Sequence, residues 1–159
     1  MLFRSNLQPL CDFIEQHYFT ILDNRDYRWA NELTIKTAFL TLLYNDRLYI
    51  MDSETALARN YADLTMIVRP EARQYPVYDF LIEFKYATLP ELGLTGEALS
   101  KLDSAQLKTL EPVQSKLTEA KTKLQSYRAI LTAKYGGVLR LRAYAVVALG
   151  FERLIWEEV

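Results

Sequence analysis

A long helical segment between two groups of strands constrains the fold of this chain more than any other feature. Pro112 stands at the favoured first position of a helix that the pattern predicts to run to about Tyr135, where Gly136-Gly137 ends it. Strand-like segments precede this helix at 77–87 and follow it at 138–149. A helix that connects two strands of one sheet favours parallel pairing between them, so the sequence predicts an α/β fold.

Two further helices are predicted before the strands. Ser5 can cap a helix that runs to about Leu22, and a second helix begins near Asn31 and ends at residues 45–46. Apolar residues recur at helical spacing in both segments. We therefore expect helices to flank the sheet.

The remaining pattern predicts short strands. Strand periodicity appears at 48–51 and 61–69, and the turn-rich sequence PEARQYP joins the second of these segments to 77–87. Such short connections are typical of an antiparallel meander. Residues 89–109 are irregular with one or two helical turns, and 151–157 forms the last strand. The sequence thus predicts a mixed β-sheet made of a three-strand meander, a crossover helix and further strands.

Size and composition indicate one domain over residues 1–159. The chain has 159 residues of which half are apolar, which is enough for a proper core. The apolar stretch 143–149 is far shorter than the roughly 20 residues that cross a bilayer, and the N-terminus has no secretory signal pattern. The single cysteine, Cys11, can form no internal disulfide. We expect a cytoplasmic protein that does not associate with membranes.

Positive charge is concentrated in one part of the chain. The net charge is −1, but residues 101–142 contain nine basic and three acidic side chains, an excess of six. Such a stretch can follow a phosphate backbone. A solvated, lysine-rich helix surface is an equally good interpretation of the charge alone.

The strand at 77–87 carries charged residues in an apolar setting. Glu83 and Lys85 share one face, whereas Phe80, Ile82 and Phe84 lie on the other. A Glu-x-Lys pair in a strand usually places two charged side chains on a solvent-exposed face of the sheet. Here the apolar neighbours throughout DFLIEFKY indicate a buried strand that projects a carboxylate and an ammonium side by side.

Asp63 supplies a second carboxylate from the preceding strand. If the two strands pair as a meander, Asp63 and Glu83 can converge at one end of the sheet. Two carboxylates a few ångströms apart form an oxygen site for a hard cation, Mg²⁺ with retained waters or Mn²⁺ in its place. Lys85 lies on the same face as Glu83 and can orient or polarise an attacking water.

With Asp63 followed by Glu83-Phe84-Lys85, the chain resembles the PD-(D/E)XK nuclease superfamily. Four segments resemble the nuclease-like domain at the C-terminal end of bacterial AAA-ATPase-like proteins: NELTIKTAFLTLLYND, YADLTMIVRPE, DFLIEFKY and YAVVALGFERLIWEEV. The resemblance implies a restriction endonuclease-like core and a Mg²⁺-dependent hydrolase that cleaves phosphodiester bonds in nucleic acid, with DNA favoured over RNA. No P-loop sequence is present, so the ATPase part would lie on a segment outside this chain.

The resemblance also assigns roles to residues. It makes Asp63, Glu83 and Lys85 catalytic, with Asp63 and Glu83 binding the metal. Glu32, on the helix before the meander, and the Phe84 carbonyl complete the predicted metal shell. As an alternative, Glu32 can form an i,i+4 ion pair on its helix.

The long helix departs from the family pattern. Related families place a glutamine and a tyrosine four residues apart there, and Lys123 and Tyr127 occupy the matching positions. We expect this helix to contact backbone phosphates rather than bases through Lys116, Lys123, Tyr127 and Arg128.

Two other classes of function compete with nuclease activity. One is a catalytically silent nucleic-acid-binding or regulatory module attached to an AAA-like ATPase, because the fold survives replacement of site residues. The other is an interaction domain that forms a homo-oligomer through the edge of its C-terminal strand.

Overall fold

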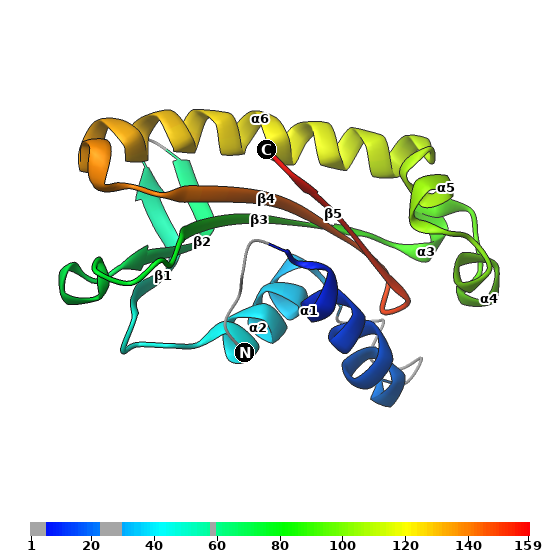
Figure 1. The fold of residues 1–159 in the computed structure, drawn as a ribbon. Helices are drawn as coiled ribbons and strands as arrows, with labels where there is room; N and C mark the ends of the chain where they lie inside the picture. Colours follow the sequence, from blue (N-terminus) through cyan, green and yellow to red (C-terminus); the bar gives the residue numbers. More distant parts are fainter. Residues whose placement is uncertain (1–5, 23–29, 58–59) are drawn as a thin grey trace.

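The computed structural model describes residues 6–22, 30–57 and 60–159, which form an α/β fold with helices on both faces of a mixed sheet (Figure 1). Ser5, the expected first cap, lies outside the described residues. The five strands stand in chain order across the sheet: β1 (Tyr49–Leu57), β2 (Asn60–Val68), β3 (Asp79–Ala87), β4 (Leu141–Leu149) and β5 (Arg153–Glu158).

The strand directions agree with the sequence prediction. β1, β2 and β3 form an antiparallel meander, β3 and β4 pair in parallel, and β5 returns antiparallel to β4. The crossover between β3 and β4 contains α6 (Glu111–Tyr135), which begins with Pro112 in its first turn. Gly136 ends the helix with a φ of 63°, a backbone conformation that glycine adopts without strain.

The helices at the N-terminal end lie on the sheet face opposite α6 (Figure 1). α1 (Gln8–Phe13) continues as a π-helical turn at Ile14–Tyr18 and a 3₁₀ turn at Phe19–Ile21, where the sequence predicted one uniform helix. α2 (Glu32–Leu43) begins as predicted, with the Asn31 side chain accepting a hydrogen bond from the Thr34 amide. Among the described residues, no helix has the length and apolar composition of a membrane-spanning segment.

Residues 89–109, expected to be irregular, form three short helices. They are α3 (Leu89–Leu92), α4 (Gly96–Ser100) and α5 (Ser104–Lys108). Thr88 and Asp103 begin α3 and α5 with reciprocal capping boxes to Glu91 and Gln106. These local hydrogen bonds stabilise helices that are too short to form on propensity alone.

Each face of the sheet has its own apolar core. On the α1 and α2 side, Phe39 packs edge-on against Phe84, with ring centroids 4.9 Å apart. On the α6 side, Leu117 and Leu124 belong to a cluster that includes Ala145 of β4. β3 lies between the two cores and is buried along its whole length, as its apolar sequence predicted.

Asp79 fastens the start of β3 to its neighbours. Its Oδ1 accepts hydrogen bonds from the Val68 amide and Arg73 Nη2, both at 2.8 Å. Its Oδ2 accepts from Arg73 Nη1 at 2.7 Å and from the Arg140 amide at 2.8 Å. One fully buried carboxylate thus joins the end of β2, the β2–β3 connection and the segment before β4.

Replacing Asp79 should destabilise the fold. Asp79→Ala leaves the partly buried Arg73 guanidinium and two amides without their acceptor, so we expect the free energy of unfolding to fall by about 3 kcal/mol or more. Urea unfolding measures this loss. Lys101→Ala is the control, because its pair with Glu97 is exposed and should contribute less than about 0.5 kcal/mol. Equal losses in the two variants would contradict the role given to Asp79.

Candidate active site

The register between β2 and β3 brings Asp63 next to Glu83. Leu64 pairs with Ile82 at the end of the paired region, so Asp63 on β2 and Glu83 on β3 are the residues directly beyond this pair. At this point the Phe84 amide donates a 2.8 Å hydrogen bond to Asp63 Oδ2. The backbone of β3 therefore holds the Asp63 carboxylate at Phe84, the residue next to Glu83.

Glu83 is a buried carboxylate with one unsatisfied oxygen. The residue is only 1% exposed. Its Oε1 accepts a 2.7 Å hydrogen bond from Lys123 Nζ on α6. Within the described part of the chain, its Oε2 is buried and has no hydrogen-bond partner. A buried carboxylate oxygen in this state can bind a further cation or proton.

A second ion pair lies beside the first. Lys85 Nζ donates to Glu119 Oε1 at 2.7 Å, so two residues of β3 are paired with two of α6. Residues two apart on a strand are separated by about 7 Å, and residues four apart on a helix by about 6 Å, so the two spacings match. We call Glu83, Lys85, Glu119 and Lys123 the charge ladder.

Burial dominates the electrostatics of Glu83. Loss of solvation raises the pKa of its carboxyl to about 7, while the hydrogen bond from Lys123 lowers it and the nearby negative charge of Asp63 raises it. In turn, the hydrogen bond to Glu83 raises the pKa of Lys123, and the bond from Lys85 lowers the pKa of Glu119. Additional positive charge at this point would stabilise the ionised glutamate.

Two of the groups at this point have the donor chemistry that a divalent cation takes. Asp63 and the unsatisfied Oε2 of Glu83 provide oxygen ligands of the kind that Mg²⁺ takes. Among the described residues, no group of three or more histidine, cysteine, aspartate or glutamate side chains is arranged to hold a metal. A cation here would therefore depend on two carboxylates, water and main-chain oxygen.

The structure does not bring Glu32 to the two carboxylates. Glu32 is exposed in the first turn of α2, which packs on the Phe84 side of the sheet. Glu83 lies on the opposite side, against α6. No three-carboxylate group forms among the described residues.

Two of the predicted phosphate-binding residues already have partners within the domain. Lys116 lies 3.5 Å from a carboxylate oxygen of Glu91. Arg128 donates to the main-chain oxygens of Val159, at 2.8 Å, and Leu141, at 3.3 Å. In this structure Arg128 thus holds the ends of the last two strands.

The other two phosphate-binding candidates also have contacts within the domain. Tyr127 is 1% exposed and lies in the α6-side core. Lys123 belongs to the charge ladder. Sequence analysis did not identify Glu119, although its spacing of four residues from Lys123 matches the opposite charges two residues apart on β3.

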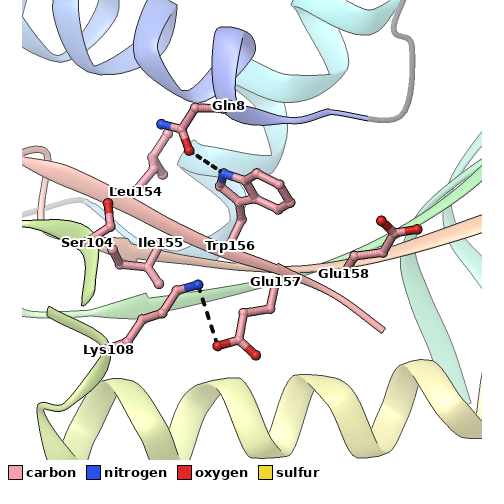
Figure 2. A pocket seen from close by; sticks show the side chains of 8 residues that line it. All are labelled: Gln8, Ser104, Lys108, Leu154, Ile155, Trp156, Glu157 and Glu158. Carbon is pink, nitrogen blue, oxygen red and sulfur yellow. Dashed lines mark hydrogen bonds and ion pairs between the residues drawn. The ribbon is translucent and has the colours of Figure 1, made fainter. Parts of the chain in front are cut away.

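A groove of about 380 Å³ lies elsewhere, along β5. Trp156 donates a 2.9 Å hydrogen bond to Gln8 of α1, and Lys108 of α5 lies 3.6 Å from a carboxylate oxygen of Glu157 (Figure 2). The complete lining is Gln8, Ser104, Lys108, Leu154, Ile155, Trp156, Glu157 and Glu158. Because neither Asp63 nor any residue of the charge ladder lines this groove, the groove is separate from the candidate active site.

Comparison of the chain with protein-family models, with curated proteins and with solved structures gave no match in any of the three.

The raised pKa of Glu83 predicts a pH-dependent stability. In the unfolded chain this carboxyl loses its proton near pH 4.5, whereas the folded state keeps it to about pH 7. Between these values the unfolded state binds fewer protons, so the free energy of unfolding should fall as pH rises and should level off above about 7. Urea unfolding in chelator, from about pH 5 to about pH 8, measures this fall.

Glu83→Gln is the matched control for this titration. The variant cannot titrate, so its stability relative to wild type should improve by on the order of 2 kcal/mol across the window. A stability difference that stays constant with pH would show that Glu83 titrates in its ordinary range.

Proposed function

We propose that this domain is a metal-dependent nuclease that hydrolyses phosphodiester bonds in DNA on a restriction endonuclease-like core. One observation carries the proposal. The buried Glu83 of β3 has an unsatisfied oxygen, Asp63 lies on the neighbouring strand β2, and Lys85 follows Glu83 by two residues on β3. A structural carboxylate would ordinarily have both oxygens satisfied.

In this proposal each residue of the centre has a separate task. Asp63 and Glu83 hold Mg²⁺ or Mn²⁺, together with the Phe84 carbonyl. When bound, the cation supplies Lewis-acid activation and neutralises charge on the phosphate. Lys85 orients the attacking water and stabilises the negative charge that develops on the phosphoryl oxygens.

The basic stretch around α6 supports a polyanionic substrate. Residues 101–142 carry an excess of six positive charges, and α6 lies over the face that contains Glu83 and Lys85. Contacts with phosphates would attract DNA to this face without reading its sequence. We therefore expect the domain to select its cleavage site by the shape of the DNA backbone and not by the base sequence.

A second candidate function is favoured by the charge ladder itself. Glu83 and Lys85, both needed for chemistry, are already paired with Lys123 and Glu119. If these pairs are permanent, the domain is a catalytically silent nucleic-acid-binding or regulatory module of an AAA-like ATPase. The two candidates share the fold and differ in turnover.

A cleavage assay tests the proposal. We expect the wild-type domain to cut single-stranded, duplex or branched DNA with Mg²⁺ or Mn²⁺ and not with chelator. Glu83→Gln and Lys85→Ala should each lower the rate at least about a hundredfold while DNA affinity is kept, because they remove groups used in the transition state. Glu97→Gln is the control, since Glu97 is exposed on α4.

Failure of the folded wild type to cut DNA or RNA with either metal would reject nuclease activity. DNA binding without cleavage would then support the silent module. Absence of both would leave the interaction domain.

Salt dependence of binding tests the predicted phosphate contacts. Lys116→Gln should weaken binding to all DNA sequences alike and lower the slope of log affinity against log salt by about 0.9 on duplex DNA, the value of one lost contact. Fluorescence anisotropy over a salt series measures the slope. An unchanged slope would show that Lys116 serves only its pair with Glu91.

A further inference from the structure

We propose that Lys123 is an internal counter-ion that holds the Glu83 carboxylate in the metal-free domain and must withdraw when a divalent cation binds there. The inference rests on the proposed metal site and specifies how that site is regulated. It concerns a lysine that the proposed chemistry does not itself require.

In the ion pair between Glu83 and Lys123, the lysine side chain is freer to move than the glutamate side chain. Glu83 stands on β3, which is buried and has strands on both sides, so its carboxylate is fixed in place. The Lys123 side chain is 42% exposed and reaches Glu83 Oε1 from α6. A lysine ammonium on a flexible four-carbon stem can leave by rotating its own side chain, without movement of the helix.

The metal-free domain needs a cation at this point. Asp63 and the buried Glu83 are neighbouring carboxylates that repel each other in a medium of low dielectric constant, and the other nearby ammonium, Lys85, has Glu119 as its own partner. Lys123 supplies one positive charge and satisfies only one of the two Glu83 oxygens. The arrangement is therefore stable without metal while an oxygen remains for a ligand.

A divalent cation and the Lys123 ammonium compete for the Glu83 carboxylate, because each weakens the interaction that the other makes with it. A single and a double positive charge a few ångströms apart repel each other strongly, because the effective dielectric constant near a buried site is well below that of water. A cation that contacts both Asp63 and Glu83 thus weakens the bond from Lys123. By linkage, the bond from Lys123 weakens metal binding to the same extent.

Withdrawal of Lys123 would also change what α6 presents to a substrate. The released ammonium, already partly exposed, becomes free to pair with a phosphate beside the metal. Lys85 has its own partner, Glu119, so withdrawal of Lys123 breaks only one of the two hydrogen bonds in the charge ladder. Metal binding and phosphate binding at this face are then coupled through one side chain.

Metal titration without nucleic acid tests the inference. We would measure Mn²⁺ affinity by isothermal titration calorimetry and by electron paramagnetic resonance of free Mn²⁺. Lys123→Met keeps much of the side-chain length and removes the charge, and it should bind Mn²⁺ at least tenfold more tightly than wild type. Lys123→Arg keeps the charge and should stay close to wild type.

Lys121→Met is the matched control. It removes a charge from the same helix two residues earlier, where Lys121 pairs with Glu157 rather than with the centre. Its Mn²⁺ affinity should equal that of wild type. If Lys123→Met does not fold, as circular dichroism would reveal, Lys123→Gln replaces it in the same comparison.

The outcomes separate the inference from the proposed function. Wild type that binds Mn²⁺ and cuts DNA, with Lys123→Met binding no more tightly, would overturn the inference and leave the nuclease intact. Equal tightening in Lys121→Met would overturn it as well, because the effect would then be general helix charge. Absence of Mn²⁺ binding in all variants together with absence of cleavage would reject both.

Discussion

The burial of a glutamate at the centre of the sheet is the constraint on which the rest of this structure depends. β3 lies between two apolar cores, so the ionised Glu83 carboxylate requires a cationic partner. α6 meets that requirement through Lys123, and its Glu119 takes the ammonium of Lys85 in the same way. α6, the crossover helix between the parallel strands β3 and β4, thus also supplies the opposite charges that neutralise Glu83 and Lys85.

This arrangement accounts for both functional interpretations of the domain. Glu83 can serve either as the anion of a structural ion pair with Lys123 or as a metal ligand. Loss of the Lys123 ammonium from Glu83 would turn the ion pair into a metal site. Asp63 and the unsatisfied oxygen of Glu83 favour the metal site, because a purely structural pair would gain from satisfying that oxygen and from having no second carboxylate nearby. Whether a divalent cation binds to these two carboxylates decides which interpretation holds.

The sequence predicted what depends on local pattern. Pro112 and Gly136 marked the ends of α6, and strand alternation set Glu83 and Lys85 on one face. β1 proved longer than predicted because it continues through Asp52 and Ser53, whose exposed side chains an edge strand tolerates. The charge ladder was missed because the position of a helix along a sheet is a tertiary property, and Glu32 lies apart because α2 packs on the opposite face.

A crystal structure of the domain grown with Mn²⁺, with data at the manganese absorption edge, would test the central claim most directly. The account predicts an anomalous peak bonded to the carboxylates of Asp63 and Glu83, at metal–oxygen distances near about 2.1 Å, with the Lys123 ammonium moved away from Glu83. A map without such a peak at saturating Mn²⁺, with Lys123 still donating to Glu83 at 2.7 Å, would contradict the account.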